Sequence, residues 1–597
     1  MTSNACKTVQ TAHDGLKDPS WPDIADDDVP GAQTLCYVMA YRAGYQKEKI
    51  FCTVVGRKTE RVITFGGLFD GALRYAAAMR ASGLASGERV AIMLPTSVEC
   101  LFAYFGSMMA RLVPALIAPP FLPRKMEIFV QSRADMLDGI GAAALIVSKA
   151  GEKTGLAIQT HVPTLRHVFA AETLSQFSGS QAGRFNEAIA PEQPAMIQFS
   201  SGSGGRQKAV LLTHGSIIRN LSAVRSAIGT LPEDVVVCWL PLFHDMGLLG
   251  CVCQALFAGC GLVLLSPAMF ISSPVSWLKL MHEKSGTIGV APNFGYQLCV
   301  DKIKTPNPGQ MDLSKWRIAM NGAEMATEET MAAFSEKFAP VGFCARAFMP
   351  VYGLAEATLA VCFTPPGAGP AIDRINRQRL ETDGVAEPAR DLKKISSIVS
   401  VGKPVPGVRV RIVDDAGNEA AERVQGRLRV QSPSLMKGYF NDPSATKTAL
   451  IDGWLDTGDL AYRVGASVFI TGRSKDIIIR AGRNYHPEHF EQAVSTVAGI
   501  RKNGVAAFGV LSPQKGTEDI VMMVEAEVRD QADKDRLVRA CMRAVSEQLE
   551  LMPDDLVIVS PMTIPRTTSG KVQRPLCRRI YLETRNARTP GAGTIGN

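Results

Sequence analysis

Short apolar segments alternate with longer amphipathic ones through the first 350 residues, and this alternation constrains the fold more than any other feature of the chain. Short runs of this kind, separated by stretches long enough for a helix, are typical of strands in βα units with largely parallel sheets. We therefore predict an α/β fold that binds its ligands at the carboxyl ends of strands. The apolar segments lie at 88–94, 195–200, 235–243, 261–266, 287–292 and 317–324.

The chain has 597 residues, which is too many for one hydrophobic core. After Ala360 the pattern changes: residues 364–397 are rich in Pro, Gly, Arg and Asp and indicate an insertion or a long irregular excursion. A smaller β subdomain follows. We predict a polar tail at 1–30, a large domain of mixed and parallel sheets flanked by helices at 31–474, and a small, mobile α+β domain at 475–597.

Composition is that of an ordinary globular protein, with 46% apolar and 20% charged residues. The 13 cysteines are scattered and lack metal-binding spacing, so reduced thiols are expected. The N-terminus has no apolar core typical of a signal peptide. The apolar stretch 248–271 contains Gln254 and Pro267, which favours two buried elements joined by a glycine turn over a membrane span. We predict a cytoplasmic protein without a transmembrane segment.

The net charge of +8 is concentrated near the C-terminus. Residues 556–597 carry seven basic side chains against one acidic side chain, Glu583. No recognition motif for nucleic acid accompanies them, so a solvated helix face and a surface for an acidic protein partner are the two interpretations we keep. The basic residues are Arg566, Lys571, Arg574, Arg578, Arg579, Arg585 and Arg588.

The segment 199–210, FSSGSGGRQKAV, has the composition of a phosphate-binding loop. Glycines let successive backbone N–H groups point into one concavity, serine hydroxyls add donors, and Lys208 adds a positive charge. Gly205 and Lys208 are not adjacent, as the Walker motif requires, and Gln207 stands where the dinucleotide motif has glycine. A flexible surface turn is the alternative.

Five further segments carry residues suited to a nucleotide and a carboxylate. They are WLPLFHDMG (239–247), NGAE (321–324), YGLAEA (352–357), WLDTGDL (454–460) and TTSGKVQR (567–574). Each is weak alone. Asp459 and Glu356 could be turn or helix-cap acids, Lys571 could be a surface lysine, and His244 could be a structural histidine.

In this order and spacing, the six segments resemble the adenylate-forming superfamily of acyl-CoA synthetases, adenylation domains and luciferases, over about residues 35–585. The resemblance implies ATP and Mg²⁺ as cofactors. It implies that Ser200, Ser201, Gly202, Ser203 and Lys208 hold the β and γ phosphates, and that Gly322, Ala323, Tyr352 and Gly353 frame the adenine. It further implies Asp459 for the ribose, Arg473 for the ribose or phosphates, Glu356 for Mg²⁺ and catalysis, and Lys571 and His244 as catalytic residues.

Within the superfamily the chain resembles the fatty acyl-AMP ligases most. PLFHDMGLLG, APNFGYQLC, NGAEM and YGLAEATLAV carry this resemblance, and His244 stands where amino-acid activators have aspartate. The segment 364–397 lies where these ligases carry an insertion that acyl-CoA synthetases lack. In that family the insertion restrains the small domain and disfavours transfer to CoA, and Lys475 occupies the hinge position. The apolar stretch 289–299 suits the lining of an acyl tunnel or plain core.

The resemblance implies that the chain activates a fatty acid to acyl-AMP, releases pyrophosphate, and transfers the acyl group to the phosphopantetheine of an acyl carrier protein, which the basic C-terminal stretch would meet. Two alternatives stay open: a fatty acyl-CoA synthetase, and a catalytically weak protein that binds an acyl nucleotide. The second arises because Gly204 and Gln207 depart from the family's loop, where threonine and proline are commoner.

Overall fold

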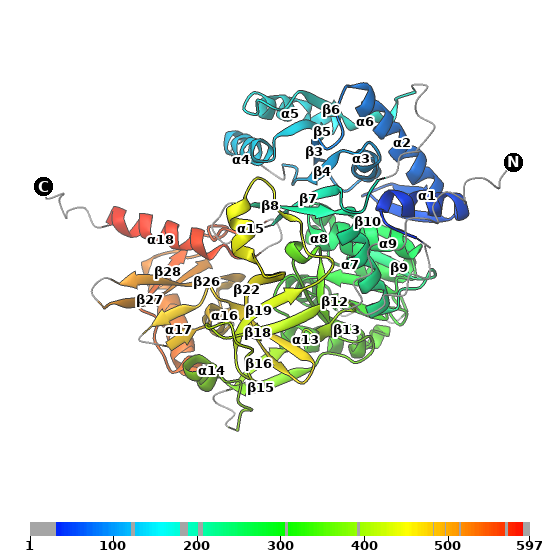
Figure 1. Cartoon of the computed structure of the whole chain (residues 1–597). Helices are drawn as coiled ribbons and strands as arrows, with labels where there is room; N and C mark the ends of the chain where they lie inside the picture. Colours follow the sequence, from blue (N-terminus) through cyan, green and yellow to red (C-terminus); the bar gives the residue numbers. More distant parts are fainter. Residues whose placement is uncertain are drawn as a thin grey trace, which may run out of the picture.

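The computed structural model describes residues 31–120, 126–178, 189–200, 207–304, 309–390, 395–480, 483–495, 497–512, 515–567 and 571–588. Figure 1 shows three regions: the sheet that contains β3 and β5 at the top, the largest body with β9, β12 and β13 below it, and the sheet that contains β26 and β27 at the lower left. Helices α1 (Leu35–Tyr45) and α18 (Arg574–Arg588) lie at opposite sides of this view.

The predicted α/β fold is confirmed, and its largest element is a nine-stranded sheet in the order β17-β14-β13-β12-β11-β9-β10-β1-β2. The strands from β13 to β1 are parallel, and β14, β17 and β2 pair antiparallel at the two edges. Every residue of β11 and β12 is buried, which explains their continuous apolar sequence. The strands are β1 (Ile50–Val55), β2 (Glu60–Thr64), β9 (Val235–Cys238), β10 (Gly261–Leu265), β11 (Ile288–Ala291), β12 (Ile318–Asn321), β13 (Phe348–Gly353), β14 (Ala360–Phe363) and β17 (Lys403–Pro404).

A second sheet is parallel throughout, in the order β4-β3-β5-β6. Its strands are β3 (Arg89–Met93), β4 (Val113–Leu116), β5 (Ala142–Val147) and β6 (His167–Ala170). Side-chain caps fix where several helices begin: Thr64 accepts from Gly67 N–H, Ser97 accepts from Cys100 N–H, and Thr213 forms a capping box with Ser216. The helices of the first 350 residues are α2 (Phe65–Ala81), α3 (Val98–Met109), α4 (Met126–Gly139), α5 (Glu152–Gln159), α6 (Ala171–Ser175), α7 (His214–Ile228), α8 (Asp245–Gly247), α9 (Gln254–Ala258), α10 (Pro267–Ser272), α11 (Val275–Glu283), α12 (Asn293–Lys302) and α13 (Glu328–Phe338).

The strand before the Gly/Ser segment does not belong to a parallel sheet, which corrects the sequence-based expectation. β7 (Pro194–Ser200) pairs antiparallel with β8 (Lys208–Thr213), and β20 (Gly438–Tyr439) pairs with the other edge of β8. Antiparallel neighbours need only a short connection, whereas parallel neighbours need a crossover helix. The apolar composition of β7 could not distinguish these two arrangements, because both bury the strand.

The stretch 289–299 lies in packed core around β11 and α12. A Cβ on Gly289 would lie 2.6 Å from the Trp316 ring, and a Cβ on Gly295 would lie 2.7 Å from the Trp239 ring. Trp239 stacks on Phe270 with ring centroids 3.8 Å apart, and its neighbours continue the aromatic packing. Of the two interpretations, acyl tunnel and plain core, plain core therefore describes this part of the stretch. Indole rings fill the space beside the glycines.

The apolar stretch 248–271 consists of a π-helical segment η2 (Leu248–Cys253), helix α9 and strand β10. Gly259 separates α9 from β10 in a left-handed conformation with φ of 71°. The predicted pair of buried elements joined by a glycine turn is thus confirmed. No helix among the described residues is long and apolar enough to cross a membrane.

The predicted β subdomain is confirmed as a five-stranded sheet of β18 (Arg409–Val413), β19 (Gly426–Gln431), β21 (Leu450–Ile451), β22 (Trp454–Val464) and β23 (Ser467–Arg473), beside which α15 (Pro443–Ala449) lies. The composition of the insertion allowed an irregular excursion, but the structure shows regular elements there. Two antiparallel strands, β15 (Ile372–Asn376) and β16 (Ile395–Val399), and the helix α14 (Arg377–Asp383) form it. Ile375 and Leu380 pack with Tyr462 and Phe469 of the β subdomain, and this small core makes the insertion regular.

The region after Lys475 begins with a two-stranded hairpin and contains a three-stranded sheet. The hairpin is β24 (Ile478–Arg480) and β25 (Arg483–Tyr485), and the sheet is β26 (Ile500–Ser512), β27 (Thr517–Ala526) and β28 (Asp555–Val559). Helices α16 (Pro487–Ser495) and α17 (Gln531–Leu549) cover one face, and α18 covers the other. Alternate residues of β26 serve the two cores: Val505 and Ala507 face α16 and α17, whereas Ala506 and Phe508 face α18.

Candidate functional site

Glu356 lies in a short turn (Ala355–Ala357) after β13 and joins three segments that are far apart in sequence. Its Oε1 accepts hydrogen bonds from the Ser200 hydroxyl at 3.3 Å and from the Tyr439 hydroxyl at 3.0 Å. Its backbone carbonyl accepts from Met436 N–H at 2.8 Å. The end of β7, the turn after β13 and β20 therefore meet at this carboxylate.

Lys208 begins β8, directly opposite Ser200 in the hairpin. Its Nζ lies 4.2 Å from the centroid of the Tyr439 ring, a cation–π distance. The ammonium group is thus close to the same tyrosine that donates to Glu356. Ser201, Gly202, Ser203 and Gly204 lie outside the described residues, while Gln207 is exposed immediately before β8.

Asp459 lies in β22, opposite Arg473 of β23, and is 7% exposed. The Tyr352 hydroxyl donates to its Oδ2 at 2.5 Å, and Arg473 Nε lies 3.3 Å from its Oδ1. Burial raises the pKa of Asp459 above its usual value, although Arg473 and the Tyr352 hydroxyl favour the ionised form. The structure therefore brings Tyr352, Asp459 and Arg473 together, as the resemblance implies.

Two glycines beside Tyr352 lie in close contact with neighbouring segments. A Cβ on Gly353 would lie 1.8 Å from the Leu359 carbonyl oxygen, and a Cβ on Gly322 would lie 2.5 Å from a Val351 methyl group. Glycine is required at position 353 because no side chain fits there. Ala323 adopts a left-handed conformation with φ of 69°, which turns the chain sharply after β12.

His244 ends the loop after β9 and precedes the short helix α8. Its Nδ1 lies 2.7 Å from Asp245 Oδ1, and Met246 N–H donates to that same oxygen at 2.7 Å. Burial favours a higher pKa for Asp245, but the His244 ring and Lys571 outweigh it and the pKa is lowered. His244 is thus held by the adjacent Asp245. This contact is compatible both with a structural histidine and with a catalytic one.

Lys571 lies near this group of residues and belongs to the region after Lys475. Its backbone N–H donates to the Thr567 hydroxyl at 3.0 Å, and its side chain interacts electrostatically with Asp245, Asp459 and Glu324. Burial lowers the pKa of Lys571, as does the nearby Arg473, and the three carboxylates oppose this effect. The charges of Lys571 and of three carboxylates from separate segments therefore influence one another.

Lys475 lies in the turn that follows β23, and the next residue belongs to a buried ion-pair cluster. Arg574, at the start of α18, contacts Asp476, Glu488 and Glu491, each at 2.9 Å. Burial alone would lower the pKa of Arg574, but these carboxylates raise it. The cluster ties α16 and α18 to the segment beside Lys475.

Hydrogen bonds among the described residues join the insertion to the region after Lys475. His489 of α16 lies between the insertion residues Glu381 and Ser396, with its Nδ1 3.2 Å from Glu381 Oε1 and its Nε2 3.2 Å from Ser396 Oγ. Arg377 donates to the Gln548 carbonyl oxygen of α17 at 2.6 Å. Both α16 and α17 are therefore attached to the insertion.

Comparison with known proteins identifies the family. Residues 40–440 match the family model of the AMP-binding enzymes. The chain is 32% identical over 83% of its length to the long-chain-fatty-acid–AMP ligase FadD26 of Mycobacterium marinum, of which 87% is covered. The chain belongs to the AMP-binding enzymes, in the fatty acyl-AMP ligase family. It is therefore an adenylate-forming ligase.

Two further relatives of this ligase carry other names. A putative acyl-CoA synthetase of Caulobacter vibrioides is 31% identical, with 90% of this chain and 91% of the relative covered. The medium-chain-fatty-acid–[acyl-carrier-protein] ligase JamA of Moorena producens is 29% identical, with 93% and 96% covered. A solved structure from work on the fatty acyl-adenylate ligases of E. coli and L. pneumophila has a TM-score of 0.87 at 30% identity, covering 93% of this chain and 98% of that chain.

The sequence did not single out two residues that the structure places in the site of this ligase. Tyr439 follows the β7–β8 hairpin by more than 200 residues and contacts both Lys208 and Glu356. Glu324 accepts from Phe294 N–H at 2.5 Å, at the start of α12, and burial raises its pKa. Glu324 was visible within NGAE, but nothing in its sequence neighbourhood indicated Lys571 as a partner.

We predict that Arg574→Met destabilises this ligase by about 3–5 kcal/mol at pH 7, because three buried carboxylates lose their cation. Without Arg574 the pKa values of those carboxylates rise above their unfolded values, so the lost stability returns as the pH falls. Denaturant unfolding at pH 7 and pH 5 measures this difference. Arg578→Met, an exposed change in the same helix, is the control. An equal loss at both pH values would contradict the ion-pair explanation.

Proposed function

We propose that this ligase activates a fatty acid in the site described above. A carboxylate oxygen of the fatty acid attacks the α-phosphorus of ATP, the new P–O bond forms, and the bond to the leaving pyrophosphate breaks. The observation that carries the proposal is the group in which Asp459 contacts Tyr352 and Arg473. The charge of Lys571 acts on this group as well. FadD26 and the matched ligase structures support a fatty acid as substrate. One of those structures, from L. pneumophila, contains an acyl adenylate and pyrophosphate (TM-score 0.72, 28% identity, 93% of this chain and 97% of that chain covered).

Lys571 reduces the main electrostatic obstacle in this reaction, which is the approach of one anion to another. A pair of unit charges about 4 Å apart interacts by roughly 4 kcal/mol at an effective dielectric of 20. An ammonium that lies between the carboxylate and the α-phosphate therefore lowers the barrier considerably. Arg473 adds a second positive charge, and Asp459 is suited to accept hydrogen bonds from the two ribose hydroxyls.

Glu356 is suited to hold Mg²⁺. Its Oε1 accepts hydrogen bonds from two hydroxyl groups, whereas its Oε2 makes no hydrogen bond with the described residues. Mg²⁺ in nucleotide sites is usually held by one or two carboxylates together with phosphate oxygens, so one carboxylate suffices here. When bound, the ion would neutralise negative charge on the triphosphate. Ser200 and Tyr439 orient the carboxylate for this purpose.

We expect Lys571→Ala to lower the rate of acyl-AMP formation about a hundredfold or more, because the charge that the transition state requires is lost. Asp459→Asn should raise the KM for ATP about tenfold, since the ribose loses a charged acceptor. Pyrophosphate release with ATP, Mg²⁺ and a series of fatty acids measures both. Lys447→Ala, an exposed change in α15, should leave the rate unchanged.

Retained turnover in Lys571→Ala would contradict the assigned mechanism. If the unmodified protein forms no acyl-AMP with any fatty acid, the alternative of a weak acyl-nucleotide-binding protein is favoured. Gly204 and Gln207, which depart from the family's loop, motivate this alternative.

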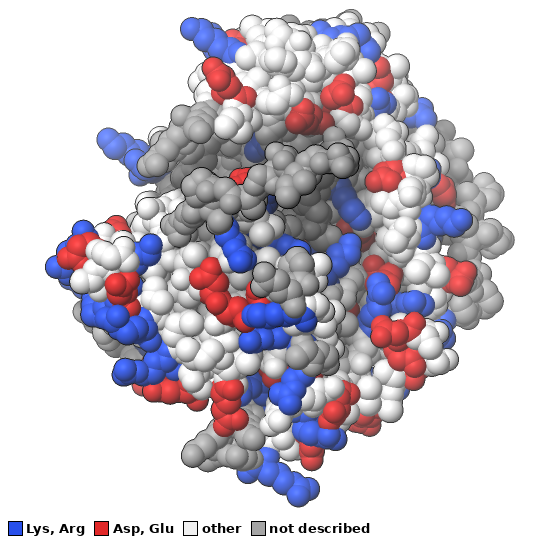
Figure 2. All heavy atoms as spheres, turned by 90° about the vertical axis from the view of Figure 1, so that its left-hand side faces the viewer, with Lys and Arg blue, Asp and Glu red and all other residues white. Residues whose placement is uncertain are grey.

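We further propose that the acyl group passes to the phosphopantetheine thiol of an acyl carrier protein. The thiol attacks the acyl carbonyl carbon, a thioester forms, and AMP leaves. The likeness to JamA supports this partner. The exposed arginines Arg578, Arg579 and Arg585 on α18 offer positive charge to an acidic carrier. Figure 2 shows the side of the molecule that carries α18, with Lys and Arg side chains in groups among the acidic ones.

The Arg578→Ala/Arg579→Ala double variant should weaken acylation of an acidic carrier protein several-fold at low salt, and the difference should shrink as salt screens the attraction. Acyl-AMP formation should be unchanged. The Arg539→Ala/Arg543→Ala variant removes the same charge from exposed positions of α17 and serves as the control. Equal effects of the two double variants would mean that net charge, and not α18, attracts the carrier.

The insertion supports a preference for the carrier over free CoA. Its contacts through Arg377, Glu381 and Ser396 hold α16 and α17, and transfer to CoA in this family is disfavoured when the small domain is restrained. The Caulobacter relative is named a putative acyl-CoA synthetase, so CoA transfer remains the alternative to be measured.

Removing these contacts with the Arg377→Met/Glu381→Gln variant should increase acyl-CoA formation about fivefold or more, as hydrogen bonds of roughly 1 kcal/mol each are lost. Acyl-AMP formation should persist. Arg379→Ala, whose ion pairs stay within the insertion, is the matched control. Efficient acyl-CoA formation by the unmodified protein would favour the synthetase alternative, and no gain in the variant would contradict a restraining role.

A further inference from the structure

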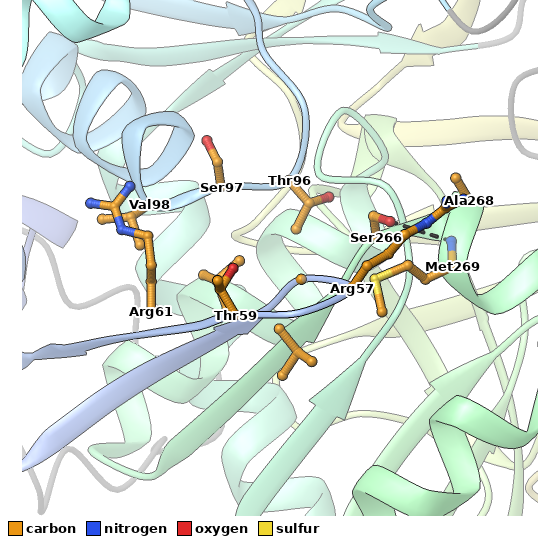
Figure 3. Close-up of a pocket in the computed structure, with 12 residues that line it drawn as sticks. Arg57, Thr59, Arg61, Thr96, Ser97, Val98, Ser266, Ala268 and Met269 are labelled. Atoms are coloured by element: carbon orange, nitrogen blue, oxygen red, sulfur yellow. Dashed lines mark hydrogen bonds between the residues drawn. The ribbon is translucent and has the colours of Figure 1, made fainter.

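A cavity of about 320 Å³ lies away from the site described above, where two sheets meet. Its walls come from the carboxyl ends of β1 and β10 in the nine-stranded sheet and from residues 96–98, which follow β3 of the second sheet. Figure 3 shows these three segments around one hollow. Carboxyl ends of parallel strands are where α/β folds usually bind ligands, and none of the residues assigned to the ligase site lines this cavity.

Two serine hydroxyls in the cavity wall have protons to donate. Ser97 Oγ accepts from Cys100 N–H at 3.2 Å and Ser266 Oγ accepts from Met269 N–H at 3.3 Å, so each oxygen caps a helix. A hydroxyl that accepts in this way still has one O–H to donate. Thr96 and Thr59 add two more hydroxyls to the lining. The polar part of the cavity is therefore rich in donors.

Positive charge comes from the turn between β1 and β2. Arg57 lines the cavity, is exposed, and has no ion pair recorded with the described residues. Figure 3 shows its side chain extending toward Ser266, while Arg61 lies on the other side of the cavity. Arg61 is paired with Glu99, so its charge is already balanced. Arg57 is thus the cation available to an anionic ligand.

The remaining wall is apolar, formed by Val54, Val55, Val98 and Met269. A cavity of this volume exceeds what one inorganic anion fills and is in the range of small-molecule sites. We propose that it binds a small phosphomonoester, whose phosphate contacts Arg57 and the hydroxyls and whose organic part contacts the valines and Met269. A phosphate has several acceptor oxygens and negative charge, which matches a guanidinium together with a set of hydroxyl donors.

Isothermal titration with phenyl phosphate and with inorganic phosphate tests this site. Phenyl phosphate should bind more tightly than inorganic phosphate, because the ring covers apolar wall. Arg57→Gln should weaken phenyl phosphate binding about tenfold or more, the effect of losing a charge-assisted hydrogen bond. Thr96→Val should weaken it by a smaller factor. Arg57 and Thr96 are not among the ligase residues, so acyl-AMP formation should not change.

Two control variants separate this cavity from other sources of phosphate binding. Lys58→Gln removes an adjacent exposed charge that does not line the cavity and should alter binding less than about twofold. Lys208→Ala, in the phosphate-loop hairpin, should leave the binding that depends on Arg57 intact. The proposal is wrong if Lys58→Gln weakens binding as much as Arg57→Gln, or if all saturable binding disappears with Lys208→Ala.

Discussion

The attraction between Lys571 and three carboxylates, Asp245, Glu324 and Asp459, is the interaction on which the site depends. Asp245 and Glu324 follow two different parallel strands, and Asp459 comes from the β subdomain. Their negative charges would repel one another without a cation. Lys571, carried by the region that contains β26 to β28, compensates them. The Arg574 ion pairs and the contacts of Arg377, Glu381 and Ser396 hold other parts of that region.

Local chemistry explains which parts of the fold the sequence predicted. Strands such as β11 and β12 are buried on both faces, so their continuous apolar sequence indicated them directly. The sequence left an insertion and a long irregular excursion open for 364–397, because the core of this segment is small: Ile375 and Leu380 pack on residues of β22 and β23 far along the chain. Likewise, the apolar run of β7 gave no sign of its antiparallel partner, since pairing direction depends on the connection and not on composition.

The same distinction applies to the site. Tyr352, Asp459 and Arg473 were predicted through the order of their motifs, and the structure brings them within hydrogen-bond or ion-pair distance. Tyr439 was missed because its role arises from contacts across the fold. Glu324 belongs to the NGAE segment, but its own role also depends on contacts that the segment does not indicate. Motif order thus identifies residues that a reaction requires, whereas residues that orient them become visible only with their neighbours.

The antiparallel arrangement of β7 and β8 has a consequence for how strongly this ligase depends on its ionic surroundings. In loops that lead directly into a helix, the aligned peptide dipoles of that helix add a fixed attraction for phosphate. The segment between β7 and β8 returns into a strand, and the next helix, α7, begins only at His214. Under the proposed function, attraction for the triphosphate rests on mobile charges such as Lys208 and a bound cation, so salt and free divalent ions should govern nucleotide affinity more than in helix-led sites.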